Sequence, residues 1–121
     1  MMFRKRYVMT LNRVHDDVEI REGGDSLLLH VEADPDRVVA GLNESSRRMQ
    51  QLKNDSPDTE FLEAARFFAS VIFGAEQADK LITFYHNDSS CVMRACSEYF
   101  THRLSHMITD IQKKRRKADQ R

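Results

Sequence analysis

The fold is constrained most by residues 61–73, which are apolar on nearly every side of a helix. A helix at the surface of a protein shows one apolar stripe, whereas a helix that is apolar all round is buried on several sides. We therefore expect residues 61–73 to form the central helix of the core, and Gly74 to end it. A chain of 121 residues is long enough for one such core, so we predict a single domain, residues 1–121.

The first third of the chain alternates between apolar and polar residues, as half-buried strands do. We expect strands at residues 7–11, 18–20 and 26–32. Gly23 and Gly24 favour a tight turn between the last two, because glycine adopts a positive φ without a steric penalty. The residues that would share the core face of the third strand are Leu27, Leu29 and Val31. The sequence therefore predicts a three-stranded antiparallel meander over residues 7–32.

Residues 35–117 show helical patterns separated by capping residues. Asp34 and Pro35 suit the start of a helix, and Asp88 or Ser89 suits the start of the last one. The four helices that we expect cover residues 35–53, 61–73, 75–85 and 90–117. In the first of them, the residues expected to face inward are Val38, Val39, Leu42, Met49 and Leu52. Strands followed by helices predict an α+β fold, with an N-terminal three-stranded antiparallel meander followed by four helices.

The net charge of zero hides a separation of charge along the chain. Residues 7–112 contain 10 Lys and Arg against 18 Asp and Glu, whereas residues 1–6 and 113–121 together contain 9 basic residues and one acid. An acidic body is a poor surface for nucleic acid, because phosphate binding requires clustered positive charge. The charge separation suits homo-oligomer formation or docking to a partner of opposite polarity.

No group of residues indicates catalysis, and no glycine-rich phosphate-binding motif is present. Cys91 and His86 lack a third, orienting group. His102 and His106 have the spacing of a zinc-binding pair without the rest of the motif. We expect no enzyme activity, no cofactor and no metal site. Because no apolar run approaches the ~20 residues that cross a bilayer, we also expect no membrane contact. Cys91 and Cys96 are expected to be buried thiols in a reducing cytoplasm.

The last part of the chain, residues 113–121, is expected to be a basic tail. Its basic cluster consists of Lys113, Lys114, Arg115, Arg116 and Lys117. Such runs occur at nucleic-acid contacts, but no aromatic residue interleaves this one to stack on bases. Lys and Arg also complement the dipole at the C-terminal end of a helix. We therefore favour an end-of-helix or partner-docking role for the cluster over nucleic-acid binding.

Three segments carry a resemblance to a known group of proteins. They are residues 33–42, 73–81 and 84–88, and the likeness continues through residues 96–114, so that it covers about residues 8–115. The chain resembles small proteins encoded in the tail-gene region of bacteriophages and prophages, and among these the tail assembly chaperones of long-tailed phages. The shared patterns are packing and capping patterns rather than catalytic signatures.

The resemblance implies a non-enzymatic role in the cytoplasm of a bacterial host. Tail assembly chaperones coat the long tape measure protein during tail morphogenesis and help to recruit tail tube protein. The contact surface that we expect on the last two helices consists of Leu81, Phe84, Tyr85, Met93, Tyr99, Phe100 and Met107. The simpler interpretation of each of these residues is that it belongs to the core.

Two other classes of function stay open at this point. One is a small structural component of the phage particle, of the connector or tail-terminator type, which would form a closed ring of fixed size. The other is a nucleic-acid-binding accessory protein, including one for DNA packaging, whose affinity for DNA would depend on salt and on Lys113 to Lys117.

Overall fold

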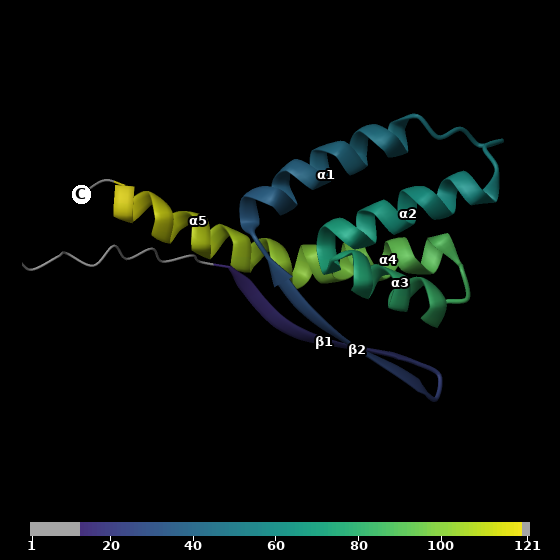
Figure 1. Ribbon diagram of the computed structural model, residues 1–121, viewed down its shortest axis with the longest axis horizontal. Helices are drawn as coiled ribbons and strands as arrows, with labels where there is room; N and C mark the ends of the chain where they lie inside the picture. Colours follow the sequence, from purple (N-terminus) through teal and green to yellow (C-terminus); the bar gives the residue numbers. More distant parts are fainter. Residues whose placement is uncertain (1–12, 120–121) are drawn as a thin grey trace, which may run out of the picture.

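The structure is a computed structural model, and it describes residues 13–119. Its elements, in chain order, are β1 (Val14–Glu22), β2 (Asp25–Ala33), α1 (Pro35–Gln50), α2 (Asp58–Phe73), α3 (Ala75–Phe84), α4 (Ser89–Tyr99), the π-helix η1 (Phe100–Leu104) and α5 (Ser105–Asp119). The hairpin lies along one side of the helices, while α4, η1 and α5 follow one another as a single long helical run (Figure 1). The fold is thus α+β, with strands before helices.

The prediction of a three-stranded meander is wrong, because the sheet of the described residues has two strands, β1 and β2, which pair antiparallel. The expected first strand, residues 7–11, lies outside the described residues. The expected second strand is the middle of β1, since the alternation already begins at Val14. The other edge of the sheet, that of β2, is covered, because α3 packs beside it and Gln77 Oε1 accepts the His30 N–H at 3.1 Å.

The hairpin places its apolar residues on the face that meets the helices. Leu29 and Val31 are buried and Leu27 is half-buried, which confirms the predicted core face of this strand. A two-residue turn at Gly23 and Gly24 joins the strands, and Gly23 has a φ of 60°. Glycine adopts this left-handed conformation readily, so the turn fits the sequence that predicts it.

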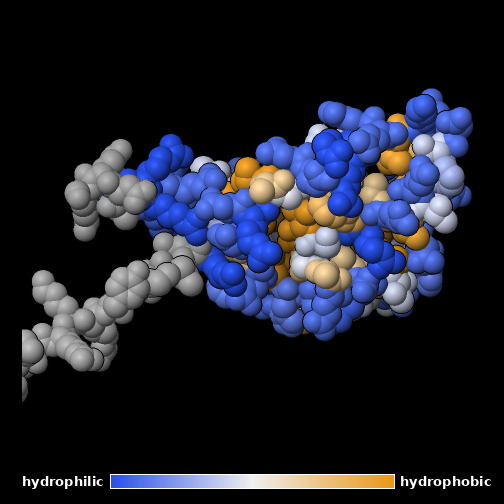
Figure 2. All heavy atoms as spheres, turned by 45° about the horizontal axis from the view of Figure 1, so that its top comes forward, coloured by the Kyte–Doolittle hydropathy of each residue, from blue (hydrophilic) through white to orange (hydrophobic). Residues whose placement is uncertain are grey.

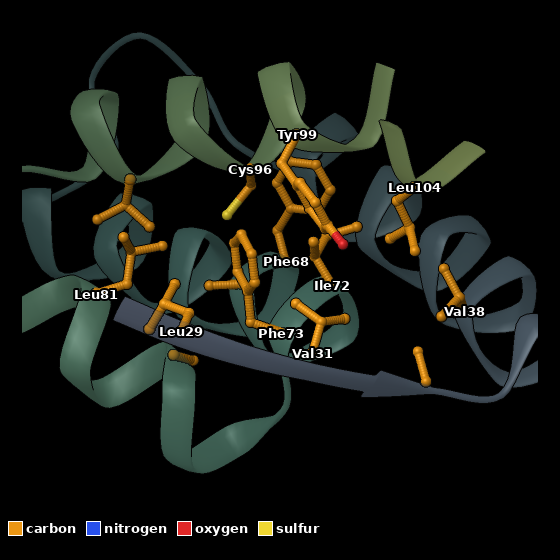
Figure 3. Close-up of a cluster of buried hydrophobic side chains, with 14 of the residues drawn as sticks. Leu29, Val31, Val38, Phe68, Ile72, Phe73, Leu81, Cys96, Tyr99 and Leu104 are labelled. Atoms are coloured by element: carbon orange, nitrogen blue, oxygen red, sulfur yellow. The ribbon is translucent and has the colours of Figure 1, made fainter. Parts of the chain in front are cut away.

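The centre of the core is α2, as the sequence predicts. Ala65 and Ala69 are fully buried, and Phe68, Ile72 and Phe73 are nearly so. These side chains meet Leu29 and Val31 from the hairpin, Leu81 from α3, and Cys96 and Tyr99 from α4 (Figure 3). The helix therefore packs against its neighbours on several sides, and the ring of Tyr99 stacks on that of Phe73 at 5.2 Å between centroids.

α1 lies directly on α2. An added methyl group at Gly41 would lie 2.8 Å from both γ carbons of Val71, so the two backbones approach more closely than larger residues would allow. Val38 is buried and Leu42 is half-buried at this contact. The expectation that Val39 faces inward is wrong, because its side chain is 42% exposed. Only one side of α1 is covered, and adjacent residues on a helix point in different directions.

The ends of the helices follow local signals. Gly74 ends α2 with a φ of 92°, and Asp88 begins α4 by accepting hydrogen bonds from the N–H groups of Ser90 and Cys91 at 3.0 and 3.2 Å. Both assignments confirm the sequence prediction. The π-helical turn η1 is not anticipated by it. The wider turn allows Tyr99 and Arg103 to reach β1 while Leu104 stays in the core.

Candidate functional site

A cleft of about 490 Å³ lies beside the hairpin, between β1 and α4, and we call it the β1–α4 cleft. Its apolar floor consists of Val18, Ile20, Phe73, Tyr85, Ala95 and Tyr99. Its charged and polar rim consists of Glu19, Arg21, Glu22, Cys91, Arg94, Glu98, His102 and Arg103. Volumes of 300–1,000 Å³ with an apolar lining and a few polar groups are typical of binding sites in proteins.

One wall of the cleft is the outer edge of β1. Glu22 and Asp25 close the two-residue hairpin, so the backbone N–H and C=O groups of Glu19 and Arg21 point away from β2. Within the described residues, the one N–H group of this edge that has a hydrogen-bond acceptor is that of Asp17, which donates to its neighbour Asp16 at 3.0 Å. The edge can therefore pair with a further strand. By contrast, Gln77 occupies the edge of β2 at His30.

Asp16 fixes one end of the cleft. Its carboxylate accepts hydrogen bonds from Tyr99 Oη at 2.9 Å and from Arg103 Nε and Nη2 at 2.5 and 2.7 Å. The side chain of Asp16 is only 6% exposed. The Arg103 guanidinium holds the pKa of this carboxyl below its usual range, while burial, followed by the bond to Asp16, raises the pKa of Tyr99. The ionised pair thus ties β1 to η1, and the hydrogen bond from Tyr99 ties β1 to the end of α4.

The predicted contact residues fall on different parts of the molecule. Leu81 is fully buried and Tyr99 is 8% exposed, so both belong mainly to the core. Tyr85 and Tyr99 meet in the β1–α4 cleft, and Phe84 packs edge-on against Tyr85 at 5.1 Å between ring centroids. The structure therefore brings Tyr85 and Tyr99 to one site, while Phe84 contacts Tyr85 without lining the cleft.

Met93 lies in a second hollow, of about 500 Å³, together with Met49, Leu52 and Phe61. Phe100 and Met107 are half-buried against the core farther along the helical run. Figure 2 shows apolar residues gathered in a hollow near the middle of one face, with hydrophilic residues around it. The predicted surface on the last two helices is therefore divided between the cleft and the helical side of the molecule.

Four residues of the cleft floor were not among the predicted contacts. Val18 and Ile20 come from β1, Phe73 comes from α2, and Ala95 comes from α4. The alternation of residues 14–20 indicates a strand, but which of its edges stays open depends on helices far away in the sequence. A pattern within β1 alone could therefore identify these side chains as half-buried but not as the wall of a site.

The basic cluster is part of α5 rather than a separate tail, because α5 extends to Asp119. Arg115 is about one-third exposed and forms ion pairs with Asp34 at 3.3 Å and Asp36 at 3.0 Å, at the start of α1. The other four residues of the basic cluster are exposed: Lys113, Lys114, Arg116 and Lys117. Within the described residues none of these four forms an ion pair.

Within the described residues, the other polar candidates do not combine into a catalytic group or a metal site. Both cysteines are free, and burial raises the pKa of the Cys96 thiol to about 12. The hydrogen bond to Asp88 raises the pKa of Cys91, which keeps this thiol protonated and poorly nucleophilic. Glu98 and His102 lie on the rim of the cleft. Between residues 13 and 119 no three His, Cys, Asp or Glu side chains are placed to hold a metal ion.

Among the described helices of this chain, none has both the length and the apolar character to cross a bilayer. Comparison of the sequence and fold with protein-family models, curated proteins and solved structures finds no match.

Proposed function

We propose that this chain is a non-enzymatic tail assembly chaperone, and that it holds an extended segment of the tape measure protein against the edge of β1. The observation that carries the proposal is the open edge of β1 beside the apolar floor of the β1–α4 cleft. In an extended peptide, main-chain hydrogen bonds to a sheet edge supply affinity, and pockets for alternate side chains supply specificity. The cleft offers both features on one side of the hairpin.

The geometry favours a peptide over a small molecule. Consecutive residues of β1, from Val18 to Glu22, line the cleft, so the open backbone edge runs along it. Every second side chain of an added strand would point to the floor formed by Val18, Ile20 and Ala95. The remaining side chains would lie beside the charged rim.

The rim tolerates many client sequences because its charges are of both signs. Arg94 and Glu98 of α4 are exposed, and within the described residues neither forms an ion pair. A long client that is coated by many copies of one small protein presents a different sequence to each copy. Backbone pairing with a mixed rim suits such a client, because the main-chain hydrogen bonds do not depend on side chains.

The proposed location is the cytoplasm of a bacterial host, where tail assembly takes place. The non-enzymatic role is supported by the state of the polar groups in the cleft. Asp16, Tyr99 and Arg103 already satisfy one another, and the Cys91 thiol stays protonated. These residues stabilise the walls of the site rather than act on a bound group.

The experiment is co-expression with the long coiled-coil protein of the same gene cluster, followed by affinity purification and sizing. We expect co-purification of many copies of this chain for each client, and soluble client. Ala95→Arg, which fills the floor of the cleft, should reduce the recovered client at least tenfold. Ser97→Arg is the matched control on the same helix, since Ser97 is exposed and outside the cleft.

Two results would contradict this function. One is equal loss or equal retention of the client in the two arginine variants. The other is a discrete ring of this chain alone with no association to the client, which would favour a structural component of the particle.

A further inference from the structure

The basic cluster at the end of α5 carries charge that the described part of the chain does not neutralise. Residues 103–117 contain six Lys and Arg and one acid, Asp110. Arg115 pairs with two acids at the start of α1, Asp34 and Asp36. The other four cations of the cluster are exposed and form no ion pair within the described residues, and we call them the α5 cations: Lys113, Lys114, Arg116 and Lys117. The end of α5 is therefore suited to an anionic partner.

The β1–α4 cleft leads toward this end of α5. At one end of the cleft, Asp16 of β1 accepts hydrogen bonds from Tyr99 and Arg103. Because α4, η1 and α5 form one helical run, α5 continues beyond this end of the cleft and past the start of β1 (Figure 1). One end of a peptide strand that is paired with β1 would therefore leave the cleft beside α5.

The spacing between the cleft and the α5 cations follows from helix geometry. At a rise of about 1.5 Å per residue, Lys113 lies roughly 15 Å beyond Arg103 along the helical run, and Lys117 lies roughly 21 Å beyond it. An extended peptide advances about 3.3 Å per residue, so about five residues span the first of these distances. A client segment in the cleft would thus place the residues beyond such a spacer next to the α5 cations.

We propose that the client segment has two parts: an alternating apolar part that lies in the cleft, and an acidic stretch about five residues away that binds the α5 cations. This inference rests on the proposed function, because it extends the site in which the client lies. The backbone edge of β1 accepts many sequences, so the α5 cations select the segments of a long client that bind. The contact is made by side chains and leaves the backbone hydrogen bonds of α5 in place.

An acidic peptide fits α5 better than nucleic acid does. Residues 7–112 contain 10 Lys and Arg against 18 Asp and Glu. A duplex is a rigid polyanion that would face this acidic body as well as the α5 cations, whereas a short peptide stretch contacts α5 alone. Glu and Asp side chains also form charge-assisted hydrogen bonds with Lys and Arg.

The test measures the affinity of the full-length chain for fluorescein-labelled synthetic peptides by fluorescence anisotropy in 50 mM NaCl. Each peptide has nine alternating Val and Ser residues, the length of β1, then a spacer of about five Gly and Ser residues and a run of Glu or of Gln. The Glu run is C-terminal in one peptide and N-terminal in another. Because α5 lies beyond one end of the cleft, we expect Glu to bind about tenfold more tightly than Gln in one order and at most about twofold in the other. At 500 mM NaCl the tenfold gain should fall to about twofold.

Substitutions on α5 identify the residues that provide this gain. Lys113→Gln together with Lys117→Gln removes two of the α5 cations and should reduce the gain from about tenfold to about threefold. Lys53→Gln together with Lys80→Gln is the matched control and should leave the gain unchanged. Both control residues are exposed, form no ion pair within the described residues and lie outside α5. Circular dichroism confirms that each variant is folded.

The proposal is overturned if Glu adds no affinity, if both orders gain equally, or if the two double variants lose the gain to the same extent. Tighter binding of duplex DNA than of the Glu peptides would also overturn it. The Gln peptides test the proposed function separately, because they should bind the wild-type chain and not Ala95→Arg. If the Gln peptides bind and Glu adds nothing, this inference alone fails, whereas if no peptide binds, the proposed function fails with it.

Discussion

The two strands of the hairpin have the same length and similar alternation, but their surroundings differ. β2 has its residues Leu29 and Val31 in the core, and at His30 its outer edge is bonded to Gln77 of α3. β1 has half-buried residues at Val18 and Ile20, and its outer edge borders the β1–α4 cleft. The comparison teaches that the helices stabilise the sheet through β2 and leave β1 available for binding.

The largest effect is expected from a pair of core substitutions that contrasts the two strands. Leu29→Ala should lower the free energy of unfolding by roughly 3 kcal/mol, because it leaves a cavity in the centre of the core. Ile20→Ala should cost only about 1 kcal/mol, because Ile20 is half-buried, yet it should weaken client binding more than Leu29→Ala does. Urea unfolding and client co-purification give the two readouts. If the two variants lose the same free energy of unfolding and the same amount of recovered client, the two strands do not have separate roles in stability and binding.

The next effect concerns the ion pair that ties β1 to the helices. Asp16→Asn should lower the free energy of unfolding by about 2 kcal/mol at pH 7, because hydrogen bonds to a charged group are lost. The pKa of Asp16 is lowered in the folded chain, so its stabilising contribution is present above the ordinary pKa of an aspartate.

This contribution should disappear as the pH falls through the lowered pKa of Asp16. Urea unfolding of the wild-type chain and Asp16→Asn between pH 7 and pH 3 measures it, and the difference between the two should shrink toward the acid end. Asp55→Asn is the control, because Asp55 is exposed and forms no ion pair within the described residues. If the difference in the free energy of unfolding between the wild-type chain and Asp16→Asn does not change with pH, the ionised pair of Asp16 and Arg103 is not the source of that difference.

A smaller effect is expected at the edge of β2. Gln77→Ala removes the acceptor of the His30 N–H and should lower the free energy of unfolding by about 1 kcal/mol. Glu76→Ala, at an exposed neighbouring position of α3, should change it little. Hydrogen exchange of the His30 amide should become faster in the first variant alone. Unchanged exchange at His30 would mean that Gln77 does not close this edge.

Local patterns were sufficient to predict much of the fold. The apolar character of residues 61–73 predicts the central position of α2, and Gly74 and Asp88 mark their helix ends correctly. The core face of β2 follows from alternation alone, because side chains in a strand point to opposite faces. These features depend on residues that are neighbours in the sequence.

The errors and omissions depend on residues that are far apart. The sequence predicts three strands, whereas the described residues form two, and no local pattern indicates that α3 covers the edge of β2. Tyr99 and Arg103 reach Asp16 across more than eighty positions of the chain, through a π-turn that no local pattern indicates. The wall of the cleft depends on the same contacts, so sequence reasoning could place Tyr85 and Tyr99 near a surface but not Val18 or Ile20 beside them.

The most direct test of the central claim is amide hydrogen exchange of β1 in the purified complex with the client. The N–H groups of Glu19 and Arg21 point away from β2, so they should exchange readily in the free chain and at least tenfold more slowly in the complex. The amides of α5 should keep their rates. A stable complex in which Glu19 and Arg21 exchange as fast as in the free chain would contradict strand pairing at β1.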